Sequence, residues 1–452
     1  MVKNKKISLS TTQIILLSFL IAILLGSLLL ALPFSSANGS AVSYIDALFT
    51  ATTSVCVTGL VTLPTATAWS AFGQAVILLL IQIGGLGVIT VMSGFMLMLQ
   101  KKMSIGDRLL IQDAFNLSTL SGLGKFIKSV LLGTAVIEMG GALLYMLVFV
   151  PDFGAKGIWI SVFNAVSAFC NAGIDVIGTN SLCDYATDPL VNLTTSLLIV
   201  LGGIGYIVWW DVLRVLKDQN RRKRAFKHLT LHSKIAIVST LILIFGGALL
   251  IFVCEYNNPA TIGELSLANK MQVSLFQSVT TRTAGFATVA QEDLTGAASI
   301  VSLALMVIGG SPVGTAGGVK TVTVVVLLCS AFATVRNKKQ ATVFDRTVSE
   351  NSIRKAVAVV TMFFAVALVS TVLLSLSTNA PAIDVIYESV SATATVGLSK
   401  NLTPSLGLMG KLVLIATMYF GRVGPISLAV ALSRQGENQN VISAPTEEIS
   451  IG

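Results

Sequence analysis

Four short segments of this sequence share residue types that suit the coordination of a dehydrated cation. Each opens with an aromatic residue, runs through small and hydroxyl-bearing residues, and ends in a glycine followed by an apolar residue. The segments are residues 49–60, 163–174, 276–286 and 387–398, and their glycines are Gly59, Gly173, Gly285 and Gly397. Glycine tolerates positive φ, so such loops can turn their carbonyl oxygens toward one axis. A ring of carbonyls there replaces the hydration shell of a monovalent cation.

The segments carry little formal charge, with Arg282 in the third and Glu388 near the start of the fourth. A divalent-cation filter would be expected to carry rings of carboxylates, so the pattern favours a monovalent ion. One such loop alone is better explained by glycines packing in a re-entrant hairpin. The glycines recur at spacings of 114, 112 and 112 residues, which favours ion binding. Arg282 is expected to stabilise its loop from behind, through an ion pair or backbone carbonyls, without contacting the ion.

The chain that must position these segments has the composition of a membrane protein. Of its 452 residues, 54% are hydrophobic and 11% are charged, whereas a soluble domain carries about 25% charged residues. Eight apolar runs reach the roughly 20 residues that a helix needs to cross a bilayer. They are residues 14–32, 75–99, 129–150, 193–215, 235–253, 300–333, 356–376 and 411–432.

The net charge of +9 reflects membrane topology. Of the 30 basic residues, 22 lie before the first run, after the eighth, or between runs two and three, four and five, or six and seven. The positive-inside rule makes that side cytoplasmic and places both termini there, and the charge then requires no nucleic-acid partner. The opposite side carries acidic residues that include Asp175 and Glu292. They would either concentrate cations or form an ordinary solvated surface.

A second landmark recurs with a similar spacing. The apolar run after each segment contains IQIGGLG at 81–87, IVLGGIG at 199–205, MVIGGSP at 306–312 or MYFGRVGP at 418–425. We therefore predict an all-α polytopic membrane protein of four parallel helix–pore loop–helix repeats. Eight transmembrane helices and four pore helices would surround a pseudo-fourfold axis. The predicted repeats are residues 1–102, 103–220, 221–337 and 338–452, the last including a cytoplasmic tail.

The third copy departs from the others within its second span. Residues 309–318 are too rich in glycine, with Pro312 among them, for a regular helix. A mid-membrane break must line a water-filled space or be packed in protein, so we expect a mobile gate loop below the pore loops; a static packing kink is the alternative. The gate residues would be Gly309, Gly310, Ser311, Gly314, Thr315, Gly317, Gly318 and Lys320. Arg422 lies at the equivalent height in the fourth copy, either facing the pore and the gate carbonyls or paired with Glu138.

The four loops, the broken third-copy helix and GRVGP together resemble the Trk/Ktr/HKT superfamily of potassium transporters over essentially the whole chain. The eight spans and the EEISIG terminus are most similar to the Ktr-type membrane subunits, the KtrB group. The resemblance implies potassium uptake across the bacterial plasma membrane, with backbone atoms before and at each glycine binding the ion. Carried onto this chain, that filter is Val57, Thr58, Gly59, Asn171, Ala172, Gly173, Thr283, Ala284, Gly285, Thr395, Val396 and Gly397.

The same resemblance implies partners. Family members form homodimers, and Gly452 matches a tail that contacts the second subunit. They associate with a cytoplasmic ring of nucleotide-binding regulatory subunits of the KtrA/TrkA type, on which ATP or ADP would act. This chain would bind no cofactor itself and would lie among membrane lipids. Potassium would be the transported ion, and sodium would be a possible activator.

Two other classes of function are considered. An alternating-access symporter of sodium and potassium is disfavoured because rocking transporters usually show inverted or twofold repeats. A membrane-embedded enzyme is disfavoured because the chain has only two histidines and few intramembrane carboxylates.

Overall fold

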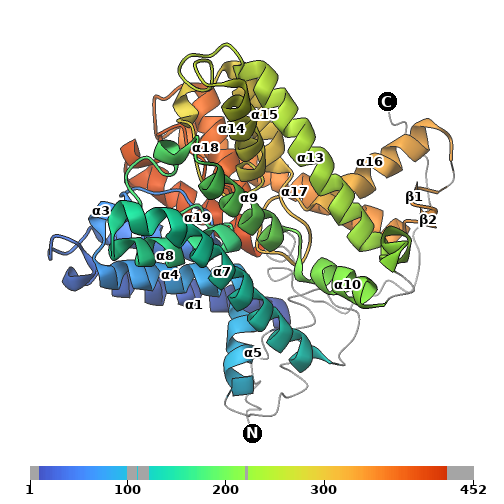
Figure 1. Ribbon diagram of the computed structural model, residues 1–452, viewed down its shortest axis with the longest axis horizontal. Helices are drawn as coiled ribbons and strands as arrows, with labels where there is room; N and C mark the ends of the chain where they lie inside the picture. Colours follow the sequence, from blue (N-terminus) through green and yellow to red (C-terminus); the bar gives the residue numbers. More distant parts are fainter. Residues whose placement is uncertain (1–9, 99–108, 110–121, 219–221, 339, 425–452) are drawn as a thin grey trace, which may run out of the picture.

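The computed structural model describes residues 10–98, 109, 122–218, 222–338 and 340–424 (Figure 1). Within these ranges the chain is helical, apart from one antiparallel pair of two-residue strands, β1 (Thr342–Val343) and β2 (Arg346–Thr347). Its minor helices are α3 (Thr65–Ala68), α12 (Ala225–His228), η1 (Pro33–Ser35), η2 (Cys183–Tyr185), η3 (Gln291–Asp293) and η4 (Thr403–Ser405). The predicted all-α class is confirmed.

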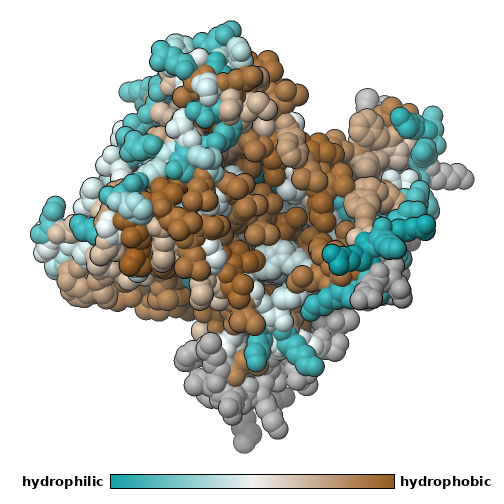
Figure 2. Space-filling view, in the orientation of Figure 1, coloured by the Kyte–Doolittle hydropathy of each residue, from teal (hydrophilic) through white to brown (hydrophobic). Residues whose placement is uncertain are grey.

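Four long apolar helices are continuous, namely α1 (Thr11–Leu30), α7 (Leu123–Phe153), α13 (Leu231–Glu255) and α17 (Glu350–Ser375). Hydroxyl side chains cap three of them: Ser10, Thr230 and Ser349 each accept a hydrogen bond from the first turn. Apolar side chains point outward at helical spacing, and Leu132, Leu147, Ile242 and Leu249 are each more than 60% exposed. Figure 2 shows apolar residues across the middle of the visible face, with hydrophilic residues gathered at its margins. These faces suit lipid, and the chain is a multi-pass membrane protein.

Each long helix is followed by a short one that cannot span a bilayer. These are α2 (Tyr44–Cys56), α8 (Lys156–Cys170), α14 (Leu267–Thr280) and α18 (Ala382–Ala394). Thirteen to fifteen residues make a helix of about 20 Å, less than the roughly 30 Å of a hydrocarbon core. Each packs on the long helix before it. The glycine-containing loops follow directly from the carboxyl ends of these helices.

A third, apolar helix follows each loop: α4 (Ala71–Leu86), α9 (Pro189–Gly203), α15 (Gly296–Val307) and α19 (Leu408–Val423). After an interruption, three continue as α5 (Val88–Met98), α10 (Tyr206–Lys217) and α16 (Thr321–Val335). Among the described residues, four helices are long and apolar enough to span a membrane, or five if α9 and α10 count as one bent span. The eight predicted spans are therefore not eight unbroken helices.

The interruption predicted for the third copy is not confined to it. Helix α4 ends at Gly87 with φ 86°, and α9 and α10 meet at Gly205 with φ 95° and a bend of 96°. Helix α19 stops before Gly424, whose φ is 89°, and residues 425–432 of that predicted span lie outside the described residues. Positive φ ends a helix, so the last glycine of the first, second and fourth landmarks is a helix stop. The third copy differs in the length of its break, residues 308–320.

The helices close into a ring. Helix α19 packs against α2, which joins the last part of the described chain to the first. Lys411 Nζ lies 2.6 Å from Asp46 Oδ1 across that contact, with 15% and 13% of the two side chains exposed. In Figure 1, α1, α4, α7 and α8 lie together on one side, and α13, α14 and α15 on the other. The predicted repeat boundaries stay a prediction.

Candidate functional site

The glycine loops begin where the short helices end in left-handed backbone. Val57, Asn171, Thr283 and Thr395 have φ between 51° and 65°, and each lies two residues before its glycine. The four glycines also have positive φ, at 99°, 64°, 83° and 95° in chain order. Left-handed residues reverse the chain at a helix terminus, and here they leave the backbone of the next two residues non-helical.

Hydroxyl groups of the short helices hold these loops. Thr53 Oγ1 accepts from the N–H of Gly59 at 3.0 Å, and Ser391 Oγ accepts from the N–H of Gly397 at 3.0 Å. Ser167 Oγ accepts from the N–H of Ile174 at 3.1 Å. In the third loop, Thr280 Oγ1 donates to the carbonyl of Phe286 at 2.6 Å. The hydroxyl-rich composition of the segments therefore supplies hydrogen-bond partners for loop backbone in a water-poor setting.

The four glycines contact one another in a closed ring. A methyl group on Gly59 would lie 3.3 Å from the Cα of Gly173 and 3.2 Å from that of Gly397. One on Gly285 would lie 3.0 Å from the Cα of Gly173 and 3.3 Å from that of Gly397. Each glycine thus has two others as neighbours, and none of the four has room for a side chain.

Backbone carbonyls follow the same cyclic order. A methyl group on Gly59 would lie 2.6 Å from the oxygen of Ala172, and one on Gly173 would lie 2.6 Å from that of Ala284. A methyl group on Gly285 would lie 2.6 Å from the oxygen of Val396. A methyl group on Gly397 would likewise meet the carbonyl oxygen of Thr58. Each glycine therefore faces the carbonyl that precedes the next glycine in the ring. The carboxyl ends of four helices also meet here, and their dipoles favour a cation.

A cavity of about 790 Å³ lies on one side of the ring, lined by the four glycines and by residues that follow them. Asp175 and Glu292 are among its lining residues. Burial raises the pKa of the Asp175 carboxyl to about 6, although hydrogen bonds from Ile177, Ser181 and Gly178 oppose that rise. Two carboxyl groups beside a narrow ring give this cavity a bias toward cations above that pH.

The 308–320 loop lies on the other side of the ring, against the residues that precede the glycines. Its two ends pair with each other. The N–H of Gly309 donates to the carbonyl of Val319 at 3.0 Å, and the N–H of Val319 donates to the carbonyl of Val307 at 3.0 Å. Thr315 Oγ1 donates to Asn171 Oδ1 at 3.0 Å, and Gly317 N–H donates to Thr283 Oγ1 at 3.0 Å. The ring therefore separates the wide cavity from this loop.

Two arginines hold the loop through its carbonyls. Arg282 Nη2 donates to the carbonyl of Gly309 at 3.1 Å. Of the two roles expected for Arg282, an ion pair or bonds to backbone carbonyls, this is the second. Arg422 Nη1 donates to Thr315 at 2.6 Å, while its Nη2 donates to Gly84 at 2.6 Å. Arg422 thus ties the loop to the end of α4, and no ion pair between Arg422 and Glu138 is recorded among the described residues. The Glu138 carboxylate instead accepts from Gln82 Nε2 at 3.3 Å.

The remaining predicted gate residues belong to the same loop. Lys320 Nζ donates to the carbonyl of Ala316, and Ser311 Oγ lies 3.0 Å from Thr321 Oγ1. Gly310 accepts from Thr321 N–H at 3.0 Å. Gly314 and Gly318 are both partly buried in the loop, close to Gly203 and Gly309 respectively. Gly452 lies outside the described residues.

Sequence reasoning missed the partners that α9 offers to the loop. The carbonyl of Gly202 accepts from the N–H of Thr315 at 3.1 Å, and the carbonyl of Gly203 accepts from the N–H of Ser311 at 2.8 Å. At the start of α10, the N–H of Tyr206 donates to the carbonyl of Val313 at 3.0 Å. Gly202 and Gly203 belong to the recurring GGxG landmark, which was read only as a marker of the repeat. A glycine pair at a helix end leaves free carbonyls and no side chain to shield them, and that was the available signal.

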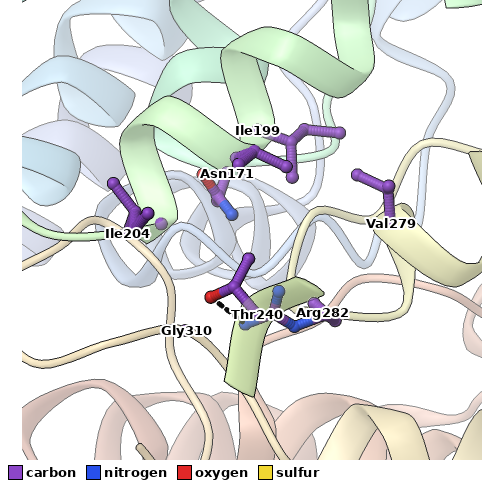
Figure 3. Close-up of a pocket in the computed structure, with 9 residues that line it drawn as sticks. Asn171, Ile199, Ile204, Thr240, Val279, Arg282 and Gly310 are labelled. Atoms are coloured by element: carbon purple, nitrogen blue, oxygen red, sulfur yellow. Dashed lines mark hydrogen bonds between the residues drawn. The ribbon is translucent and has the colours of Figure 1, made fainter. Parts of the chain in front are cut away.

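A small cavity of about 10 Å³ separates the second glycine loop from Arg282 (Figure 3). Asn171 and Ile199 line one side, while Thr240, Arg282 and Gly310 line the other. Neither Asn171 Nδ2 nor Arg282 Nε has a hydrogen-bond partner within the described part of the chain. The cavity is therefore bordered by two unpaired donors that come from different loops.

Comparison with known proteins places this architecture in a family. The family model of TrkH, a cation transport protein, matches residues 3–442. The chain is 39% identical to the potassium/sodium uptake protein NtpJ of Enterococcus hirae, covering all of this chain and 99% of that protein. It is 37% identical to the Ktr system potassium uptake protein B of Bacillus subtilis, covering 99% and 98% of the two chains. The crystal structure of the potassium transporter TrkH from Vibrio parahaemolyticus shares the fold, with a TM-score of 0.74, 16% identity, and 95% and 86% of the two chains covered.

The resemblance drawn from the sequence is confirmed over the full length of the chain, and the family it indicates consists of transporters, not enzymes. The chain belongs to the TrkH family of cation transport proteins.

Proposed function

We propose that this protein carries potassium into the bacterial cell through the ring of glycine loops, which acts as a selectivity filter. The observation that carries the proposal is the cyclic order in which each glycine faces the carbonyl before the next glycine. Such an arrangement offers a dehydrated cation oxygen ligands from four sides. The filter would comprise residues 57–59, 171–173, 283–285 and 395–397, contributed by four repeats around a pseudo-fourfold axis.

Two arguments support potassium as the transported ion, namely the chemistry of the carbonyl ring and the names of related proteins. Carbonyl dipoles without carboxylates suit a monovalent cation, and the acidic side chains Asp175 and Glu292 lie in the adjoining cavity. Relatives at 37% and 39% identity are named for potassium uptake and for potassium/sodium uptake. Potassium is therefore the proposed cargo, with sodium as a possible activator.

The 308–320 loop would be the gate. It lies against the residues that precede three of the four glycines, where it would obstruct an axial path. Arg422 and Lys320 add positive charge on that side and donate to loop carbonyls. A loop that is rich in glycine and held by hydrogen bonds has the freedom to move when those bonds break.

The assembly we propose follows the family resemblance. The chain would form a homodimer in the plasma membrane with both termini cytoplasmic, and its carboxyl end at Gly452 would contact the second subunit. A cytoplasmic nucleotide-binding ring responding to ATP or ADP would set the position of the gate.

The first experiment is a comparison of cation fluxes into liposomes that contain the purified protein. Potassium and rubidium should enter much faster than sodium or lithium, because a rigid carbonyl ring discriminates by ion size and field strength. Equal sodium flux would contradict potassium selectivity, and a fixed coupling of sodium to potassium would favour symport. If neither the wild-type protein nor the Arg422→Gln variant described below shows any flux, the proposed cation pathway through the ring is refuted.

Gly59→Ser is expected to lower the potassium-to-sodium flux ratio by about tenfold, since a change of roughly 1.4 kcal/mol in relative ion binding has that effect. The new side chain would meet the carbonyl of Ala172 at 2.6 Å and would have to adopt a φ of 99°. Gly246→Ser is the matched control, because Gly246 has open space around it and no positive φ. An unchanged ratio in Gly59→Ser would remove this loop from the filter.

Arg422→Gln is expected to raise potassium flux by about tenfold, because charge-assisted hydrogen bonds of roughly 1.5–3 kcal/mol each hold the loop in place. The variant loses the bonds to Thr315 and Gly84. Arg354→Gln removes an exposed arginine of α17 and should leave flux unchanged. If Arg422→Gln folds normally and its flux equals that of the wild type, the loop is not the barrier.

Asp175 should make uptake sensitive to external pH when external potassium is subsaturating. Its pKa is raised to about 6, so the carboxyl is ionised at pH 7.5 and becomes protonated as the pH falls through 6. Potassium flux should therefore fall between pH 7 and 5, and Asp175→Asn should abolish that step. Glu292→Gln removes another carboxyl of the same cavity and should leave the midpoint of the flux–pH curve near pH 6. If that midpoint persists in Asp175→Asn, Asp175 is not the titrating group.

A further inference from the structure

The 308–320 loop is bonded to the second glycine loop through one side chain. Thr315 Oγ1 lies 3.0 Å from Asn171 Oδ1 and 3.0 Å from the carbonyl of Phe169, the residue two before Asn171. Both side chains are buried, with Thr315 fully covered and Asn171 1% exposed. In this enclosed setting a hydrogen bond orients its partners more strongly than one at the surface.

The orientation of the Asn171 amide depends on that bond. Its Oδ1 and the carbonyl of Phe169 share the single proton of the Thr315 hydroxyl, and its Nδ2 has no partner within the described residues. Figure 3 shows the amide nitrogen directed toward the small cavity whose far side holds Thr240 and Arg282. Without the Thr315 hydroxyl, the amide would lose its recorded hydrogen bond and would have this space to turn into.

Asn171 is one of the residues that shape the ring. It has φ 60° and ψ 42°, and the carbonyl of the next residue, Ala172, faces Gly59. Left-handed backbone is strained for most side chains, although asparagine tolerates it better than most. Asn171 directly precedes Ala172, so a shift of its backbone also moves the Ala172 carbonyl.

The contacts between the loop and the ring are not fourfold. The positions equivalent to Asn171 are Val57, Thr283 and Thr395. Thr283 accepts from Gly317 N–H, and Gly317 also packs against Thr395, whereas the apolar side chain of Val57 cannot hydrogen-bond. The second loop is the one whose side-chain amide relies on a side chain of the gate.

We propose that Thr315 is a positioning residue that determines cation selectivity, because its hydroxyl holds Asn171 and thereby sets the direction of the Ala172 carbonyl. The inference rests on the proposed function and adds that gate position and ion preference are coupled. By thermodynamic reciprocity, an ion that prefers one geometry of the second glycine loop also biases the 308–320 loop.

The test compares two threonine-to-valine substitutions, one within the 308–320 loop and one at the first residue of α16. Thr315→Val removes the hydroxyl that reaches Asn171, and Thr321→Val removes one that bonds to Ser311 inside the loop. The readout is the potassium-to-sodium permeability ratio from reversal potentials in planar bilayers, which does not depend on how many proteins are open. Thr315→Val should lower the ratio by about fivefold, the effect of losing one buried hydrogen bond. Thr321→Val should leave it unchanged, and Thr315→Ser should restore it.

Asn171→Gly tests the link from the other side and keeps the left-handed backbone accessible. It should lower the ratio as Thr315→Val does, and the double variant should be no less selective than Asn171→Gly alone, because both changes break the same contact. If Thr315→Val is too unstable to purify, an unchanged ratio in Asn171→Gly still overturns the inference, because the contact would then not affect selectivity.

The outcomes separate the inference from the function on which it rests. If the wild-type protein and the Arg422→Gln variant show no potassium-selective flux, the proposed function fails. If the wild type is selective and Thr315→Val alters only the size of the current, the coupling is refuted and the filter assignment stands. Additive losses in the double variant would also overturn the coupling.

Discussion

Backbone groups within a bilayer have no water to bond with, and the described structure is organised around this constraint. The four glycine loops satisfy it with hydroxyls of the helices that lead into them, such as Thr53 and Ser391. Glu388 extends this arrangement beyond the fourth loop, where it accepts from Ser399 and from both N–H and hydroxyl groups of Thr403. Once these loops are held from behind, the carbonyls of residues such as Ala172 and Ala284 are left to face the ring. In the filter that we propose, a cation would supply these carbonyls with the interaction that the protein does not provide.

The same constraint explains the two arginines beside the 308–320 loop. Thirteen residues of irregular backbone present several carbonyls that helix geometry does not satisfy, and Arg282 and Arg422 donate to those of Gly309 and Thr315. The charge of each arginine is in turn compensated by backbone dipoles, since no carboxylate bonds either guanidinium among the described residues. This arrangement holds the loop without a permanent ion pair. Its position therefore depends on hydrogen bonds to the ring, to helix α9 and to the two arginines.

A near-fourfold ring and a single loop beneath it place different demands on the sequence. The ring needs four equivalent positions without side chains, which is why glycine occupies all of Gly59, Gly173, Gly285 and Gly397. The loop cannot respect that symmetry, because one segment meets three different neighbours. Asparagine and threonine stand where they bond the loop, and valine stands where no such bond is recorded. The departures from symmetry thus mark the contacts between the two parts.

The sequence by itself determined the helical membrane class, the family, and the residues of the ring and the loop, because these depend on apolar length, composition and spacing. Glycines at a constant interval predict equivalent loops whatever their neighbours are. It did not determine that the landmark glycines Gly87 and Gly205 end helices, since a glycine in an apolar run serves equally for packing or for a helix stop. Nor did it determine which carbonyls Arg282 and Arg422 bind, or that Thr315 reaches Asn171. Those contacts join residues from 27 to 338 positions apart. Only the closure of the helices into a ring brings them within hydrogen-bonding distance, and local sequence carries no record of that closure.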